Sequence, residues 1–204
     1  MAAAALVAVV DWVAVGTGRR RVELASKPAV LLLLVGAALA LTPESSGQRA
    51  WFVAALAASL VGDVALLAPP RWFVAGLAAF LVAHLAYVAG ILLEPGPGES
   101  ALFGLLLAGI GGAALGVPII RGALQRRGAV LAAAATAYLL AISATVVAAG
   151  ASGEPVARIG AVALYASDGI LGWNRFVRPL PQGRLLTRVP YHAGQALMVL
   201  SLIA

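Results

Sequence analysis

The chain consists almost entirely of apolar stretches that are each long enough to cross a lipid bilayer. A membrane-spanning helix needs about 20 mostly apolar residues. Eight stretches meet this condition: 2–18, 25–41, 50–68, 72–93, 101–120, 128–149, 156–173 and 188–204. With 62% hydrophobic and 11% charged residues, the chain has too few charges to cover a surface that faces water. The sequence therefore predicts an all-α, polytopic bundle of about eight transmembrane helices, in a single domain spanning residues 1–204.

Charged residues in the connecting segments divide between the two ends of this bundle. Twelve of the 14 Lys and Arg residues fall in or beside the odd-numbered loops, and only Arg49 and Arg158 fall on the other side. Four acids lie in the loops that have few basic residues: Glu44, Glu94, Glu99 and Glu154. Because cytoplasmic loops carry an excess of Lys and Arg, the odd-numbered loops are expected in the cytoplasm and both termini outside.

The first apolar stretch is expected to be a retained helix rather than a signal peptide. A signal peptide carries its basic residues before the apolar stretch, whereas Arg19, Arg20 and Arg21 follow it here. Abundant Ala, Gly, Val, Leu and Arg are typical of bacteria with GC-rich genomes, so we expect the bacterial inner membrane as the location.

Composition and motifs exclude several classes of function. Cysteine is absent, which removes disulfides, thiol nucleophiles and thiolate-bound metals. The net charge of +6 comes from short loops between apolar runs, so it favours contact with anionic membrane lipids over nucleic acid. The sequence contains no HExxH, no Cys/His cluster and no GxSxG. No metal or cofactor is expected.

Four ionisable residues fall inside the apolar stretches: Asp11, Asp63, His84 and Asp168. Such a residue costs about 2.5–3.5 kcal/mol at the centre of a membrane helix, so it is usually paired or functional. At 1.5 Å per residue, Asp63 and Asp168 both lie roughly 8–9 Å below the cytoplasmic boundary. His84 lies deeper, roughly 18 Å from the start of its helix. Two carboxylates at matching depth predict a pocket that opens toward the inner leaflet.

Further polar residues gather near the same level, and each has a structural alternative. Lys27 either faces the pocket or extends to the interface, and Ser59 either faces the pocket or bonds to its own helix. Tyr87, Tyr191 and Gln195 are candidates for its wall, although tyrosines often serve only in packing. Asp63, Asp168 and His84 could also be purely structural, and a Ser59–His84–Asp triad is conceivable. Asp11 is expected to pair with a neighbour, and His192 to be exposed near the interface.

The polar residues above lie in five short segments. In chain order these are Ser-Lys-Pro at 26–28, Ser-Leu-Val-Gly-Asp at 59–63, Gly76 and Phe80 before His-Leu-Ala-Tyr at 84–87, Gly-Ala and Leu-Tyr before Ser-Asp within 160–168, and Tyr-His-Ala-Gly-Gln at 191–195. The ordered set resembles the YhhN/TMEM86 family of lysoplasmalogenases. The resemblance covers nearly the whole chain. It implies hydrolysis of the vinyl ether bond of a lysoplasmalogen, which gives a fatty aldehyde and a glycerophospho-base.

Two buried carboxylates suit that reaction. One can protonate the alkenyl carbon, while the second, ionised, stabilises the resulting cation and activates water, as in glycosidases. We therefore predict Asp63 and Asp168 as the catalytic pair without assigning the acid, His84 as the residue that orients one of them, and Lys27, Ser59, Tyr87, Tyr191 and Gln195 as substrate-binding residues. The lysophospholipid would enter from the cytoplasmic leaflet, with its head group near Lys27 and the cytoplasmic arginines. Hydrolysis of another lysolipid, or a transporter that uses the same acids, remains an alternative.

Overall fold

A computed structural model describes residues 1–94, 96 and 101–203, and all regular structure in these ranges is helical. The helices are α1 (Ala2–Gly16), α2 (Arg20–Ala40), α3 (Ser46–Leu67), α4 (Phe73–Leu92), α5 (Ala101–Gly111), α6 (Val117–Arg127), α7 (Ala129–Ala151), α8 (Pro155–Phe176) and α9 (Gly183–Leu200). A short 3-10 turn, η1 (Pro70–Trp72), precedes α4, and a π-helical segment, η2 (Gly112–Gly116), joins α5 to α6.

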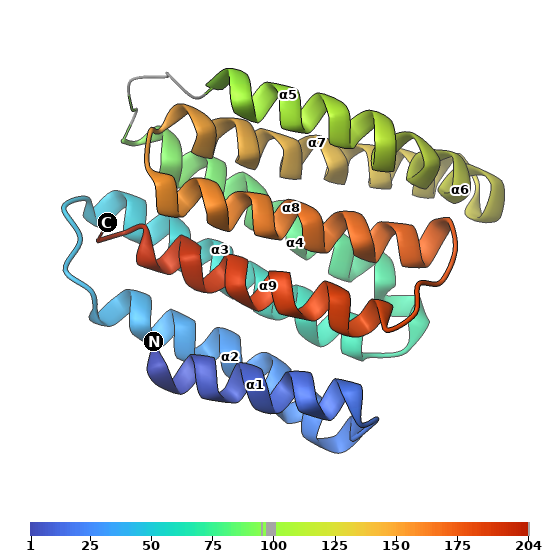
Figure 1. Ribbon diagram of the computed structural model, residues 1–204, viewed down its shortest axis with the longest axis horizontal. Coiled ribbons are helices and arrows are strands. Elements are labelled where there is room, and N and C mark those ends of the chain that lie inside the picture. The colour runs from blue at the N-terminus through green and yellow to red at the C-terminus, as the bar shows by residue number, and fades with distance from the viewer. Residues whose placement is uncertain (95, 97–100, 204) are drawn as a thin grey trace.

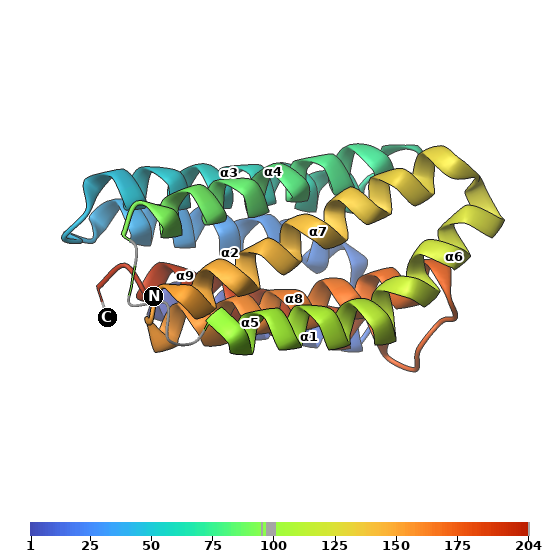
Figure 2. The same cartoon turned by 90° about the horizontal axis from the view of Figure 1, so that it is seen from above.

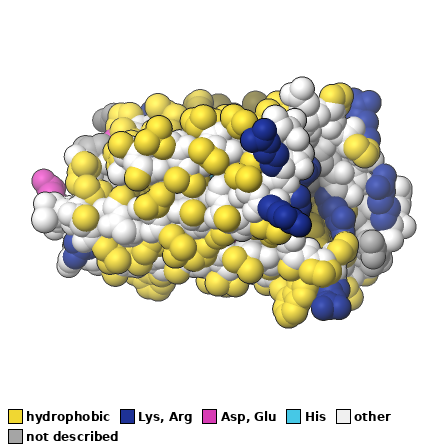
Figure 3. Space-filling view, turned by 90° about the horizontal axis from the view of Figure 1, so that it is seen from below, with side chains coloured by type: hydrophobic (Ala, Val, Ile, Leu, Met, Phe, Trp, Pro, Cys, Tyr) yellow, Lys and Arg dark blue, Asp and Glu magenta, His cyan; other side chains and the backbone are white. Residues whose placement is uncertain are grey.

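The helices run along the long axis of the molecule, and both termini lie at the same end (Figure 1). Viewed from above, α3 and α4 form one face, while α1, α5, α8 and α9 form the opposite face (Figure 2). Lys and Arg side chains gather around a hollow at the end remote from the termini (Figure 3). The two ends of the bundle therefore differ in charge as the loops predicted. Which end faces the cytoplasm stays a prediction, and Glu99 lies outside the described residues.

The polytopic helical bundle predicted from the apolar stretches is confirmed. Among the described residues, five helical segments are long and apolar enough to cross a membrane: α2, α3, α4 with η1, α5 continued through α6, and α7. α1 is apolar but shorter. α8 and α9 each carry several charged residues, which lower their hydropathy.

Two helices begin five residues earlier than the apolar stretches predicted. α2 begins at Arg20 instead of residue 25, and α9 begins at Gly183 instead of residue 188. Hydropathy places charged residues in loops, but here Glu23 and Arg184 lie in the first turns of these helices, and Glu23 is buried. Their charges are paired with each other, which permits burial of Glu23 inside the bundle. The stretch predicted at 101–120 likewise continues as a helix to Arg127.

Glycines allow α8 and α9 to approach closely. A Cβ atom on Gly194 would lie 2.9 Å from the carbonyl oxygen of Gly160, and one on Gly160 would lie 3.2 Å from the carbonyl oxygen of Gly194. Small residues of this kind let membrane helices pack backbone to backbone. The close contact fixes α8 against α9, and each of these helices carries polar residues of the candidate site.

Gly104, Ala108, Gly112 and Gly116 have the spacing of small residues that is typical of a closely packed helix interface. A Cβ on Gly104 would lie 2.8 Å from the Cα of Val147 in α7, whereas Gly112 has open space around it and Gly116 only ordinary contact. The close approach is therefore confined to Gly104. From Gly112 the π-helical segment changes the helix register, which turns the later glycines away from that contact.

We expect Gly104→Ala to destabilise the protein by about 1–3 kcal/mol, because the added methyl group overpacks against the backbone of α7. Gly109→Ala is the matched control, since a Cβ at that position meets nothing within 4 Å. It should be neutral or stabilising by up to about 1 kcal/mol. Thermal unfolding of the two variants in detergent measures the difference, and equal unfolding midpoints would contradict the packing role of Gly104.

Candidate active site

A cavity of about 540 Å³ lies at the basic end of the bundle. It is lined by side chains from five helices, among them Lys27 of α2, Asp63 of α3, Phe80 of α4, Asp168 of α8 and Tyr191 of α9. The two carboxylates that the sequence placed at matching depth thus line the same cavity. Leu66, Leu67, Leu171 and Leu180 add apolar wall, so the cavity combines a polar base with surfaces that suit a lipid.

Asp63 is completely buried and held by two neighbours. The ammonium of Lys27 lies 2.8 Å from its Oδ1, and the hydroxyl of Tyr191 donates to its Oδ2 at 3.0 Å. Lys27 is itself only 5% exposed, so it faces the cavity and does not extend to the interface. An ammonium at this distance favours the ionised form of the Asp63 carboxyl group.

Gly62 and Phe80 position this pair. A Cβ on Gly62 would collide with the ring of Phe80 at 2.6 Å, so glycine lets the ring pack directly on α3. The same ring packs edge-on against Tyr191, with 5.8 Å between ring centroids. Tyr191 is thereby held with its hydroxyl on Asp63, which explains why glycine precedes the acid in the segment 59–63.

Asp168 is bonded to His84, which the sequence placed deeper in the bundle. His84 Nε2 lies 3.0 Å from Asp168 Oδ2, and His84 Nδ1 lies 3.1 Å from the hydroxyl oxygen of Thr145. That hydroxyl lies 3.1 Å from the carbonyl oxygen of Ala141 and 3.4 Å from that of His84, and when it donates its single hydrogen to either of them, its oxygen accepts from Nδ1–H. A carboxylate oxygen and an imidazole nitrogen approach to 3.0 Å only with a proton between them. The His84–Asp168 contact therefore holds a proton beside the cavity.

Tyr138 covers the other side of His84. Its ring meets the imidazole edge-on, with 5.7 Å between centroids, and the side chain is 6% exposed. Its hydroxyl is buried without a hydrogen-bond partner among the described residues. Tyr138 therefore packs on the imidazole and also carries an unsatisfied polar atom next to it.

Ser59, Tyr87 and Gln195 do not line the cavity. Tyr87 donates to Gln195 Oε1 at 2.5 Å, and Gln195 Nε2 donates to the Ser59 hydroxyl at 3.0 Å. All three are buried in the interior and tie α4, α9 and α3 together. The wall position expected for Tyr87 and Gln195 is therefore not observed. The conceivable Ser59–His84 triad is not formed either, because each residue is bonded elsewhere.

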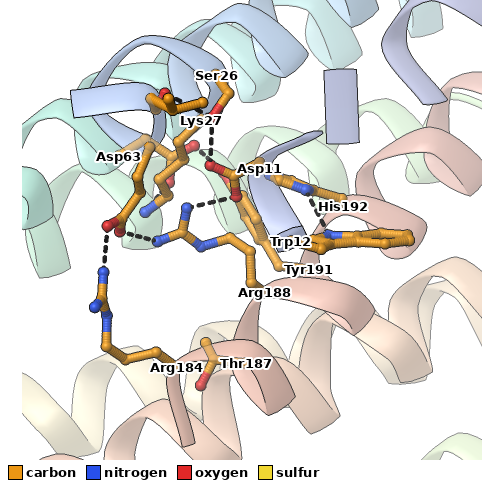
Figure 4. Close-up of polar contacts among 12 residues, drawn as sticks. Asp11, Trp12, Ser26, Lys27, Asp63, Arg184, Thr187, Arg188, Tyr191 and His192 are labelled. Carbon is orange, nitrogen blue, oxygen red and sulfur yellow. Dashed lines mark hydrogen bonds and ion pairs between the residues drawn. The ribbon is translucent and has the colours of Figure 1, made fainter. Parts of the chain in front are cut away.

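A second buried ionic cluster lies beside the cavity, centred on Arg188 of α9 (Figure 4). Its guanidinium bonds Asp11 Oδ2 at 2.8 Å and Glu23 Oε1 at 2.9 Å, and Ser26 donates to the other oxygen of Asp11 at 2.8 Å. Arg184 reaches the second oxygen of Glu23. The cluster joins α1, α2 and α9, and it supplies the partner that the sequence left unnamed for Asp11.

His192 is buried, so the prediction of an exposed interfacial histidine is wrong. It is 2% exposed, and its Nδ1 accepts a hydrogen bond from the Trp12 indole at 3.1 Å. α9 turns this residue toward α1, away from the cavity, and the short first helix covers it. His192 lies near the start of the predicted stretch 188–204, which suggested exposure, but α1 covers this part of α9.

Glu23, Thr145 and Arg188 were not singled out from the sequence. Glu23 lies among basic residues in the segment between the first two predicted helices, so it resembles an ordinary loop residue. It is nevertheless the one acid in the sequence that lies in an odd-numbered loop. Thr145 is a small residue in a long Ala-rich helix, without any signal that it meets a histidine. Arg188 was counted among loop arginines, although Tyr191 and Gln195 follow it at helical spacing and indicate a shared face.

The sequence model of the YhhN family matches residues 22–202. The chain belongs to the YhhN family. Among curated proteins, it is similar to lysoplasmalogenase TMEM86B of Mus musculus and of Rattus norvegicus, each 50% identical over 42 residues, or 21% of this chain. These matches cover only 19% and 18% of the relatives' own lengths. No solved structure matches the chain.

The family match contains all the residues that line the base of the cavity, from Lys27 to Tyr191. It begins after α1, so Asp11 and Trp12 lie outside it. The YhhN segment thus carries the two carboxylates and their direct partners. Residues of α1 complete the adjoining ionic cluster.

Proposed function

We propose that this protein is a membrane-embedded hydrolase that cleaves the vinyl ether bond of lysoplasmalogens and releases a fatty aldehyde and a glycerophospho-base. The observation that carries the proposal is the shared cavity, in which the Asp168 carboxyl group lies 3.0 Å from His84 Nε2 and the Asp63 carboxyl group lies 2.8 Å from the Lys27 ammonium. Membership of the YhhN family and the local similarity to lysoplasmalogenase TMEM86B support the choice of substrate. The proposed location is the bacterial inner membrane, with substrate arriving from the cytoplasmic leaflet.

The reaction adds one water across the vinyl ether. A proton adds to the alkenyl carbon that does not bear oxygen, which leaves an oxocarbenium ion at the neighbouring carbon. Water attacks that carbon and loses a proton, which gives a hemiacetal. The hemiacetal then breaks its bond to the glycerol oxygen, which gains a proton while the hemiacetal hydroxyl loses one. Aldehyde and glycerol hydroxyl are the products. The difficult step is proton transfer to carbon, which needs an acid held next to the double bond in a site that excludes bulk water.

Asp168 is assigned as the acid, with His84 as the residue that positions and resupplies its proton. Asp168 lines the cavity, whereas His84 lies behind it and contacts the carboxyl group. The proton held in this contact can pass from the carboxyl group to the substrate carbon. His84 then neutralises the carboxylate that remains, as buried charge requires a partner.

Asp63 is assigned as the group that stabilises the cation and accepts a proton from the attacking water. The Lys27 ammonium at 2.8 Å favours its ionised form, and the Tyr191 hydroxyl fixes its orientation. A preorganised carboxylate in a site of low dielectric stabilises a developing positive charge more strongly than water does. Two carboxyl groups in different environments thus divide the acid and base roles.

Substrate profiling tests the proposal against its alternatives. The purified protein is incubated separately with a lysoplasmalogen, with the saturated alkyl ether analogue and with an acyl lysophospholipid, and the products are identified by mass spectrometry. The proposal requires fatty aldehyde from the lysoplasmalogen alone. Release of fatty acid from the acyl compound would show a different lysolipid hydrolase, and the absence of any product would favour a transporter or lipid-handling protein.

We expect Thr145→Val to lower the rate of aldehyde release by about tenfold or more. The substitution removes the acceptor for Nδ1–H of His84 and leaves a buried donor unpaired, at a cost of about 1–3 kcal/mol. Thr145→Ser keeps the hydroxyl and should retain most activity. Thr136→Val in the same helix is the matched control, because Thr136 bonds only to its own helix at Ala132. Equal kinetics for the two valine variants would contradict the positioning role of Thr145.

A further inference from the structure

Three arginines line the outer part of the cavity, where the chain is exposed. The side chains of Arg20 and Arg184 are 49% and 56% exposed, and Arg175 is exposed as well. They contrast with Lys27, Asp63 and Asp168 at the base, which are buried. Basic side chains are visible around the hollow in Figure 3. The two carboxylates thus lie at the bottom of the cavity, and arginines surround its opening.

The charges at this rim are not balanced by the residues that the structure describes. Lys27 is paired with Asp63, and Arg188 is shared between Asp11 and Glu23. Arg20 and Arg184 both depend on the same Glu23, and Arg20 also donates to the carbonyl of Leu67. Arg175 has no carboxylate within ion-pair distance among the described residues, and its guanidinium lies 4.6 Å from the centre of the Phe73 ring. Arg175 and Arg184 therefore retain donors for an anion.

Both arginines stand two helical turns from the base of the cavity. Arg175 follows Asp168 by seven residues on α8, and Arg184 precedes Tyr191 by seven residues on α9. A spacing of seven residues returns to the same helix face after a rise of roughly 10 Å. α8 and α9 pack against each other, so they present the two guanidinium groups at a similar height above the carboxylates.

We infer that Arg175 and Arg184 form a subsite for the phosphodiester of a single-tailed glycerophospholipid. The inference rests on the proposed function, because the glycerol backbone of such a lipid is short enough for the phosphate and the reacting bond both to lie within this rise. Guanidinium groups bind phosphate oxygens through paired, charge-assisted hydrogen bonds. Stacking on Phe73 holds Arg175 in place before the ligand arrives.

This assignment changes the role expected for Lys27. The head group was expected near Lys27 together with the cytoplasmic arginines. Lys27 is buried at the base and neutralised by Asp63, so it serves the carboxylate and leaves the phosphate to the rim. The subsite also predicts selectivity, because an alkenylglycerol without phosphate would lose the interaction while keeping the reacting bond.

Binding of an uncleavable lipid tests the subsite without relying on turnover. The probe is 1-O-hexadecyl-glycero-3-phosphocholine, which lacks a vinyl group, compared with 1-O-hexadecylglycerol, which lacks the phosphate. In nanodiscs, Arg175→Gln should weaken binding of the phospholipid about tenfold and leave binding of the alkylglycerol unchanged. Arg178→Gln is the matched control, since Arg178 is exposed in the same segment but does not line the cavity.

Two outcomes would overturn the inference. Arg175→Gln could weaken both lipids alike, or neither, which would show that the phosphate is not bound there. Inorganic phosphate could displace the phospholipid at concentrations no higher than the lipid's own dissociation constant, which would point to a site for free phosphate. Arg184→Gln should reproduce the effect of Arg175→Gln, and circular dichroism establishes that each variant is folded.

Failure of this inference is distinguishable from failure of the proposed function. If the protein binds the phospholipid probe through Arg175 but releases no aldehyde, the subsite is supported and the proposed reaction is contradicted. If the protein releases aldehyde with the same KM from phosphorylated and unphosphorylated alkenyl substrates, the proposed reaction is supported and the phosphate subsite is contradicted.

Discussion

Asn in place of Asp168 should lower the rate of aldehyde release by about 10²–10⁴-fold, the usual contribution of a positioned acid or base. The amide cannot give up a proton to carbon, although it fills the same space and can still bond to His84. Asp63→Asn should cause a loss of the same order, because it removes the charge that faces the cation and leaves Lys27 without its partner. Steady-state kinetics of purified variants measure both effects.

Glu44→Gln is the control for this pair of variants. It makes the same change from carboxylate to amide at an exposed residue near the opposite end of the bundle. It should leave kcat and KM unchanged. Activity within a few fold of the unmodified protein for Asp168→Asn, in a folded sample, would overturn the assignment of the acid.

The second large effect is expected for stability. Arg188→Met removes the only charge that both Asp11 and Glu23 contact among the described residues. Breaking a buried ion pair from one side costs about 3–5 kcal/mol, because the remaining charge stays buried without its partner. The unfolding midpoint in detergent should fall sharply, and the loss should appear with or without substrate.

A double variant separates the ionic contact from packing. In Asp11→Asn with Arg188→Met, the carboxylate left behind by the arginine is also removed, so part of the lost stability should return. Arg178→Met, at an exposed position, should change stability by less than about 0.5 kcal/mol. If the double variant is as unstable as the sum of the single variants, the two residues are not coupled and the described ion pair does not stabilise the bundle.

Hydropathy predicted the helices well, because each has to cover itself with apolar residues in lipid. It misjudged the first turns of α2 and α9, since Glu23 and Arg184 look like loop residues until their partners are known. Asp11 and Arg188 are 177 positions apart, so no local pattern could connect them. The internal partner of a buried charge depends on which helices are neighbours, and that information is not local.

The candidate site was predicted in part for a similar reason. Depth along each helix placed Asp63 and Asp168 at one level, because the rise per residue is fixed and their distances from the helix ends can be counted. Counting residues does not give the rotation of each helix about its axis, which sets the direction in which each side chain points. His84 faces Asp168, whereas Tyr87, one turn later, bonds Gln195 below the cavity. Small differences in helix orientation decide which polar residues reach the cavity.

The most direct test of the proposed chemistry is the isotopic composition of the product formed in D₂O. Purified protein is given a lysoplasmalogen, the aldehyde is trapped at once as a hydrazone, and its mass is determined. Protonation at carbon by Asp168 requires one deuterium on the carbon next to the carbonyl group, and Asp168→Asn should yield almost no aldehyde. An aldehyde without deuterium, or no aldehyde from the unmodified protein, would contradict vinyl ether hydrolysis at this site.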